Sequence, residues 1–166
     1  SLFLDRLFHG VRLFRSRELV DYDYETPRES ESLSGCFLMV RRDVVDQVGL
    51  LDERFFFYWE DVDWCKRIHA AGWKLVYYPP AISIHYGGAS SIAAPVRFQI
   101  EMVKADLLYW KKHMGPARCA VSWCFNVLGS AIRFGGWILV RILRLKAREY
   151  CTGYVKGYWG RLRWLL

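Results

Sequence analysis

The segment Trp59-Glu60-Asp61-Val62-Asp63-Trp64-Cys65-Lys66-Arg67 places three carboxylates within four residues. Helical composition continues to Ala71 and is followed by Gly72, a common signal for the end of a helix. A helix N-terminus stabilises negative charge by about 0.3–1 kcal/mol at exposed sites, whereas crowded like charges raise the pKa of at least one carboxyl group. A carboxylate in that position can take a proton from an alcohol. The segment therefore predicts a helix that begins with candidate catalytic acids, Glu60 and Asp61.

The three acids also have purely structural interpretations. On a helix, Asp61 and Asp63 would point to nearly opposite faces, so we do not expect them to share one task. Asp63 lies four residues before Arg67, which is the spacing of an intrahelical ion pair. Glu60 could act only as a favourable first-turn charge. Spacing alone leaves both interpretations open.

Aromatic residues, Phe55–Trp59, come directly before the acids. Clusters of this kind are most often part of a hydrophobic core. Tyr58 and Trp59 adjoin the carboxylates, however, and their flat faces could stack on sugar rings. Core packing and ligand binding are both possible for this cluster.

A single histidine, His85, follows the acidic helix in the sequence. It lies near the end of an expected strand, Ala81–Tyr86, which Pro79-Pro80 separates from another expected strand, Lys74–Tyr78. A lone histidine is usually structural. If the strand packs beside the acidic helix, His85 becomes a candidate metal ligand through a ring nitrogen.

The rest of the first 116 residues shows weaker patterns. Residues 1–33 are poorly patterned and are expected to form a connector. Asp43 is suited to capping a short helix. The further expected elements are a buried strand over Cys36–Val40, that short helix over Val44–Val48, and a long helix over Val96–Met114 that ends at Gly115-Pro116.

Composition fits a single globular domain. The chain has 166 residues, of which 53% are hydrophobic and 25% charged, which argues against disorder. Five cysteines, an odd number without a C-x-x-C pair, indicate neither a zinc knuckle nor a disulfide framework and favour a reducing compartment. Dinucleotide, P-loop, zinc-protease and nucleophile-elbow motifs are absent from the sequence.

Positive charge is concentrated in the last 50 residues. Residues 117–166 hold nine basic residues and one acidic residue, a net charge of +8, whereas residues 1–116 hold 15 basic and 16 acidic residues, so the chain totals +7. The longest uncharged run, Cys119–Ile132, has 14 residues, fewer than the roughly 20 that cross a bilayer. If the tail is one helix, five arginines fall within an arc of about 140°: Arg118, Arg133, Arg141, Arg144 and Arg148.

That arrangement predicts a basic amphipathic helix lying in the headgroup layer of an anionic membrane. The alternative is a helical hairpin that covers the domain with its arginines in water. Gly129, Gly135 and Gly136 count against one unbroken helix. Nucleic-acid binding is less favoured, because long aliphatic runs separate the arginines.

Several motifs in order resemble one known family over residues 34–91. They are Ser34–Arg42, Val48–Phe56, Trp59–Arg67, Ala71–Trp73, Pro80-Ala81, His85 and Gly88–Ser90. Together they resemble the C-terminal half of family-2 glycosyltransferases, in particular the rhamnosyltransferase-like and galactofuranosyltransferase-like group. The stretch Lys111–Pro116 also suits this family, whereas residues 1–33 and 117–166 match only in general character.

The resemblance implies an α/β fold, the acceptor-side half of a GT-A glycosyltransferase fold over residues 34–116, followed by the helical tail. It implies that the nucleotide-binding half lies elsewhere in a longer chain and that this portion alone is inactive. Asp61, paired with Glu60, would be the general base. His85 would complete the coordination of a Mg or Mn ion on the sugar-nucleotide diphosphate. Gly35, Trp59, Tyr58 and Asp63 would line the substrate site.

The implied activity is inverting, metal-dependent transfer of a sugar from a nucleotide-sugar to a hydroxyl of a saccharide or lipid-linked saccharide, as in cell-wall or polysaccharide biosynthesis. The protein would be cytoplasmic and peripheral at the inner face of the membrane, held through residues 117–166, without a nucleic-acid partner. The alternative is a non-catalytic, membrane-associating remnant or scaffolding module of the same fold.

Overall fold

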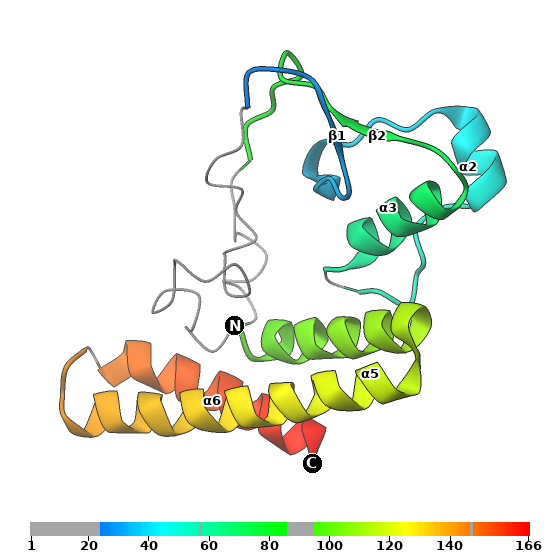
Figure 1. Cartoon of the computed structure of the whole chain (residues 1–166). Helices are drawn as coiled ribbons and strands as arrows, with labels where there is room; N and C mark the ends of the chain where they lie inside the picture. Colours follow the sequence, from blue (N-terminus) through cyan, green and yellow to red (C-terminus); the bar gives the residue numbers. More distant parts are fainter. Residues whose placement is uncertain (1–23, 57, 86–94, 147) are drawn as a thin grey trace, which may run out of the picture.

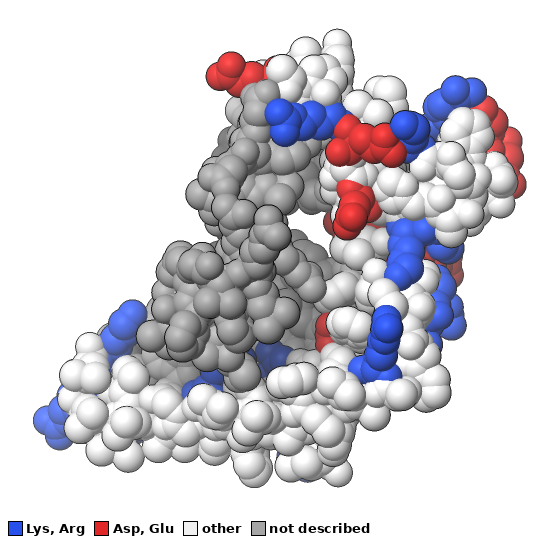
Figure 2. Space-filling view, viewed as in Figure 1, with Lys and Arg blue, Asp and Glu red and all other residues white. Residues whose placement is uncertain are grey.

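The computed structural model describes residues 24–56, 58–85, 95–146 and 148–166. Residues 24–85, here called the α3 unit, lie above a helical layer formed by residues 95–166 (Figure 1). Figure 2 shows acidic side chains mainly on the α3 unit and a largely uncharged surface along the helical layer. In chain order the elements are β1 (Arg28–Ser30), η2 (Gly35–Phe37), α2 (Arg42–Val48), α3 (Glu60–Ala70), β2 (Leu75–Tyr77), α5 (Pro95–Ile142) and α6 (Arg148–Leu165).

The core of the α3 unit is small. Cys65 and Ile68, three residues apart on one face of α3, pack with Val44 of α2 and Leu75 of β2, and all four are buried. The strands pair antiparallel, with Glu29 opposite Val76. Within the described residues, β1 and β2 form a two-stranded sheet. The architecture is mixed and compatible with part of a glycosyltransferase, whereas the GT-A sandwich itself stays a prediction.

Several expected elements are confirmed. The short helix appears as α2, the strand over Lys74–Tyr78 as β2, and the acidic helix as α3. Gly72, at φ +86°, follows the end of α3, and its N–H donates to the His69 carbonyl at 2.9 Å. Asp43 is not the N-cap of α2, because Arg41 holds that position. Asp43 instead pairs with Arg41 from within the first turn.

Two expected strands are wrong. Within Cys36–Val40 the chain forms the end of the short η2 turn and then extended backbone, with Cys36, Phe37 and Met39 exposed. Residues 81–85 form neither strand nor helix and are exposed, and Tyr86 lies outside the described residues. An apolar run becomes a strand only where a neighbour satisfies its backbone N–H and C=O groups. In the described part of the chain, only β1 and β2 provide such pairing.

The helical layer is a set of three packed helical segments. Gly115, at φ +83°, and Pro116 bend α5 between residues 95–114 and 116–142. α6 then runs back along α5 (Figure 1). Gly160 permits close packing there, since a Cβ on it would lie 3.0 Å from Cγ1 of Val96. The indole of Trp123 donates to the Leu165 carbonyl at 3.1 Å.

The expectation of a single basic stripe along the tail is therefore wrong. The second segment of α5 continues unbroken through Gly129, Gly135 and Gly136, and the helix is interrupted instead after Ile142, before α6 begins at Arg148. Arg133 is half-buried and donates to the Gly129 carbonyl, so it does not line an outer face with Arg148. The helical-hairpin alternative describes the arrangement better.

By length and composition, one helix of the described ranges, Val96–Ile142, is apolar enough to cross a membrane. Its most apolar window has a mean hydropathy of 1.3, and 11% of that window is buried. The uncharged run of 14 residues did not predict this, because it is shorter than the roughly 20 residues that cross a bilayer.

A buried carboxylate, Asp63, joins the two parts of the structure. Its side chain is 0% exposed, and its Oδ2 accepts from Arg67 Nε at 2.9 Å within α3. Its Oδ1 faces two groups near the end of the first segment of α5, Lys112 Nζ at 2.6 Å and His113 Nε2 at 2.7 Å. Burial opposes the charged form of Asp63, but hydrogen bonds from these three partners outweigh it and hold the pKa of this carboxyl below its ordinary value.

Arg67 and Lys112 extend this network. Arg67 donates to the carbonyls of Val48 and Leu50, which ties α3 to the end of α2. Lys112 also pairs with Asp52 at 2.7 Å. The ion pair predicted from the four-residue spacing is confirmed, and it is one part of a larger network.

We expect Asp63→Asn to destabilise the fold by about 3–5 kcal/mol, because it removes a buried charge that pairs with Arg67 and leaves Lys112 with Asp52 alone. Asp46→Asn, which removes the exposed pair with Arg42, is the matched control and should have little measurable effect. Urea unfolding would measure both changes. Because the pKa of Asp63 is lowered in the fold, its contribution is present above the ordinary value of 3.8 and is lost as pH falls through the folded-state value. Equal midpoints for the two variants would contradict the proposed role of Asp63.

Candidate functional site

The N-terminus of α3 meets the η2 turn at one close contact. The backbone N–H of Gly35 donates to Asp61 Oδ2 at 2.9 Å, and the N–H of Val62 donates to Asp61 Oδ1 at 2.8 Å. A Cβ on Gly35 would lie 3.3 Å from the Cβ of Asp61, so a side chain there would displace its neighbour. The structure thus brings together two predicted site residues that are 26 positions apart in the sequence.

Hydrogen bonds hold the Asp61 carboxylate in place but leave it with free acceptor positions. The side chain is half-buried, and each oxygen accepts one backbone hydrogen bond. A carboxylate has about four acceptor positions, so it can still accept from a ligand hydroxyl. Asp61 is therefore an oriented acceptor at the surface of the α3 unit.

Two consecutive residues before the acids have left-handed backbones. Tyr58 has φ +64° and Trp59 has φ +74°. For residues other than glycine this conformation costs about 1–3 kcal/mol each and persists where the surroundings enforce it. Here α5 provides the contacts: the Trp59 ring lies 4.7 Å from that of Tyr109, and the Tyr58 ring 5.3 Å from that of Phe98. Core packing of the aromatic cluster is confirmed for these contacts, and ligand stacking stays a prediction, with Tyr58 42% exposed.

Glu60, the first residue of α3, occupies a different environment from Asp61. It is half-buried, and its Oε2 is buried without a hydrogen-bond partner among the described residues. Burial, assisted by the adjacent charge of Asp61, raises the pKa of Glu60 above its ordinary value, although the Glu60 backbone N–H partly opposes the shift. The two neighbouring acids thus differ in exposure and in hydrogen bonding.

The predicted substrate contact of Asp63 does not agree with the structure. Its side chain is fully buried, and both oxygens are occupied by cationic groups. Asp63 lies on the side of α3 that faces α5 because it is two residues beyond Asp61, about 200° around the helix. We therefore correct its role to a structural one.

His85 is exposed, at the end of a described segment. Within the ranges that the structure describes, no group of three or more His, Cys, Asp and Glu side chains is arranged to hold a metal ion. The metal-binding prediction for His85 stays a prediction. Gly88–Ser90, the motif that follows, lies outside the described residues.

Sequence reasoning missed the contribution of α5 to the site. Lys112 and His113 contact Asp63, and Tyr109 supports Trp59. The available signal was weak: a basic pair at the end of a long helix, about 50 residues after the acids. Only folding places it beneath α3.

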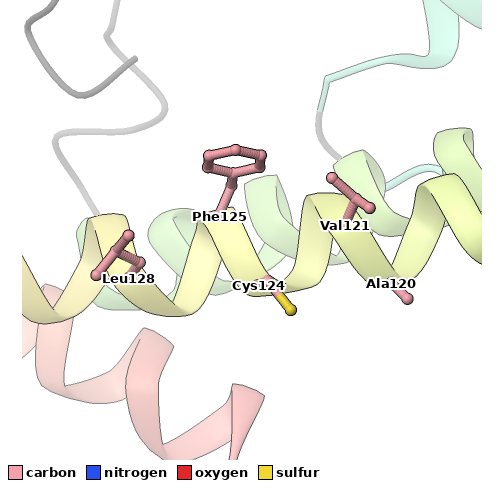
Figure 3. A pocket seen from close by; sticks show the side chains of 5 residues that line it. All are labelled: Ala120, Val121, Cys124, Phe125 and Leu128. Carbon is pink, nitrogen blue, oxygen red and sulfur yellow. The ribbon is translucent and has the colours of Figure 1, made fainter.

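The helical layer carries a shallow hollow of about 270 Å³, which Figure 3 shows from close by. It is lined by Ala120, Val121, Cys124, Phe125 and Leu128, all from the second segment of α5. These side chains offer no hydroxyl, amide or charge to a sugar or phosphate. The hollow is therefore separate in chemistry from the acids of α3.

We expect Glu60→Gln to stabilise the protein at neutral pH. Because the folded-state pKa is raised, the folded protein binds more protons than the unfolded chain, and its stability falls as pH rises from 4.5 through the raised value. The variant should show a flatter dependence of melting temperature on pH in that range. Glu53→Gln, an exposed change, is the control and should keep the wild-type profile. An unchanged profile in Glu60→Gln would contradict the burial of its charge.

Comparison with known proteins identifies relatives with similar sequences. The chain is 32% identical over 126 residues to the N-acetylglucosaminyl-diphospho-decaprenol L-rhamnosyltransferase of two strains of Mycobacterium tuberculosis, CDC 1551 / Oshkosh and ATCC 25618 / H37Rv. That alignment covers 75% of this chain and 40% of the relative. This chain is also 40% identical over 53 residues to Rhamnosyltransferase WbbL of Escherichia coli strain K12. That alignment covers 32% of this chain and 20% of the relative.

The chain thus spans less than half the length of these curated relatives. No family model and no solved structure matches it. The similarity to proteins named rhamnosyltransferases supports a glycosyltransferase relationship for this chain.

Proposed function

We propose that this chain is the acceptor-side part of a family-2 glycosyltransferase, which transfers a sugar from a nucleotide-sugar to a hydroxyl of a saccharide or lipid-linked saccharide. The hydrogen bond between the Gly35 N–H and Asp61 Oδ2 carries the proposal. It joins two separate motifs at one carboxylate, at a position that remains reachable from solvent. The rhamnosyltransferase relatives support the reaction class.

In the proposed reaction Asp61 is the general base. Its carboxylate takes the proton of the acceptor hydroxyl, which makes that oxygen a better nucleophile. The oxygen forms a bond to the anomeric carbon while the bond from that carbon to the diphosphate oxygen breaks, and the nucleoside diphosphate leaves. Attack opposite to the leaving group inverts the anomeric centre.

The neighbouring residues would orient the acceptor. Glu60 is half-buried at the same helix tip, and its raised pKa suits it to share a hydrogen bond with a sugar hydroxyl. Tyr58 has exposed ring surface beside it, and Trp59 is held against α5. Gly35 leaves room for the acceptor next to Asp61, because a larger residue would press on the carboxylate.

We propose His85 as one ligand of a Mg or Mn ion that accompanies the donor diphosphate. One imidazole does not make a resident metal site, and the described residues supply no group of three ligands, so we derive no step through the ion. When bound, a divalent ion offsets the charge that gathers on the departing diphosphate. The remaining ligands would have to come from the donor and from residues beyond those described.

A lipid-linked acceptor would place the reaction at a membrane. We therefore propose a cytoplasmic, peripheral location at the inner face of the membrane, with residues 117–166 as the attachment. The basic end of the helical layer, where α5 meets α6, carries exposed Arg144, Lys146 and Arg148. These cations suit anionic lipid headgroups.

We expect Asp61→Asn, made in the complete gene product that contains this chain, to lower kcat by about 10²–10⁴-fold. The amide oxygen can keep one of the two backbone hydrogen bonds that the carboxylate accepts, and we expect the fold and nucleotide-sugar binding to persist. Turnover would be measured with a nucleotide-activated L-rhamnose and a lipid-linked saccharide, and donor binding by calorimetry. Asp46→Asn, an exposed change in α2, is the control and should keep full activity.

Retention of more than about a tenth of the wild-type kcat in Asp61→Asn would remove Asp61 from the role of base. Absence of turnover in the wild-type protein, with donor and acceptor both present, would instead favour a non-catalytic remnant of the same fold.

We expect His85→Ala to weaken the dependence of turnover on divalent ions. Titration of Mg or Mn after removal of metal with a chelator should require a higher ion concentration for half-maximal rate, because one ligand has been lost. His69→Ala is a suitable control, since His69 contacts the Ser30 carbonyl in the α3 unit. Identical titrations for wild type and His85→Ala would count against this ligand.

A further inference from the structure

The second segment of α5 exposes a continuous apolar face. Six large side chains lie within an arc of about 100° around the helix axis, and each is more than half exposed. They are Val121, Phe125, Leu128, Ile132, Leu139 and Ile142, here called the outward stripe. No charged residue falls within this arc between the first and last of them.

The opposite face of the same segment is polar and turned inward. Ser122 Oγ and Asn126 Nδ2 donate to Asp106 Oδ2 in the first segment of α5, at 2.6 and 2.8 Å. From α6, Arg161 donates to Asn126 Oδ1 at 2.9 Å and to Gln99 Oε1 at 3.0 Å. The helices of this layer therefore meet through a hydrogen-bonded polar network as well as through buried apolar residues such as Val103, Cys151 and Leu162.

A water-soluble bundle packs its apolar faces inside and leaves polar faces to water, whereas the second segment of α5 turns a polar face inward and exposes large apolar side chains. Polar side chains that pair inside a bundle, with apolar side chains outside, are typical of helices in contact with lipid. The low burial of the most apolar window, 11%, supports the same conclusion, since a core helix of a soluble protein is mostly buried.

Charge is arranged to match a membrane surface. Exposed cations flank the stripe, with Arg118 before its first residue and Arg144, Lys146 and Arg148 after its last. Figure 2 shows the described surface of the helical layer as mostly white along its length, with blue at the end where α5 meets α6. Cations at that end can contact lipid phosphates while the stripe contacts acyl chains.

We infer that the outward stripe of α5 inserts into the hydrocarbon of a lipid bilayer, with the helix lying in the plane of the membrane. An in-plane position follows because only one face is apolar, while the other face bonds to α6 and to the first segment of α5. The inference deepens the proposed membrane partner: apolar insertion, rather than a basic stripe, provides the binding.

The test is flotation of the full chain with vesicles of phosphatidylcholine alone and of phosphatidylcholine mixed with phosphatidylglycerol, at low and high salt. Neither donor nor acceptor is present, so the outcome does not depend on sugar transfer. We expect binding to both vesicles that persists in high salt, because apolar insertion is not screened. The paired change Leu128→Glu and Ile132→Glu should weaken binding about tenfold or more.

Ile82→Glu is the matched control, because Ile82 is 83% exposed but lies in the α3 unit. It should bind as the wild type does. Binding that requires phosphatidylglycerol and disappears in high salt would overturn the inference in favour of headgroup charge alone. Absence of binding to either vesicle would also overturn it. So would a paired variant that binds vesicles as the wild type does but has lost a dimer in sedimentation equilibrium.

Cysteine labelling tests the same surface in the unmodified chain, so that misfolding of a variant cannot decide the result. Cys124 and Cys36 are both free and exposed, the first beside the outward stripe and the second in the α3 unit. Vesicles should slow the reaction of Cys124 with a membrane-impermeant maleimide and leave Cys36 unchanged, as read by peptide mass spectrometry. Equal labelling of Cys124 with and without vesicles would overturn the inference.

Discussion

A buried negative charge, Asp63, holds the acidic helix over the helical layer. Its oxygens contact Arg67 of α3 and both Lys112 and His113 of α5, so one carboxylate fixes the distance between two parts of the chain that are separated by about 50 residues. Such a group is costly to bury alone and favourable only when fully paired. The α3 unit has a small apolar core, so this polar joint has a large share in fixing its position.

The geometry at the tip of α3 follows from that joint. With α3 seated on α5, Tyr109 and Phe98 hold the aromatic residues that precede the acids, and the chain enters the helix through two left-handed residues. With this entry into α3, Asp61 faces η2, and the backbone N–H of Gly35 donates a hydrogen bond to its carboxylate. The side of α3 that carries Asp63 is thus used for structure, and the side that carries Asp61 is the proposed catalytic side.

The helical layer connects this tip to a proposed membrane surface. Asp106, Asn126 and Arg161 fasten its segments from within, which leaves apolar side chains on the outside of α5. A site joined to such a layer would lie close to a lipid surface. That arrangement suits an acceptor whose sugar is attached to a lipid anchor.

The sequence by itself determined the local features. The acids, the helix-forming residues after them and Gly72 predicted α3. The four-residue spacing predicted the ion pair between Asp63 and Arg67. Both features depend on contacts within one or two helical turns. The motif order also indicated the glycosyltransferase relationship that the named relatives support.

Tertiary structure decided the rest. The run after Gly35 has strand-like composition but lacks a paired neighbour in the described chain, and so forms a turn and extended backbone. The arginines of the tail were expected on one helix, but a break before Arg148 separates them, and the polar face of α5 turns inward to meet Asp106. Which side of a helix faces its neighbours depends on partners distant in the sequence, and periodicity alone does not identify those partners.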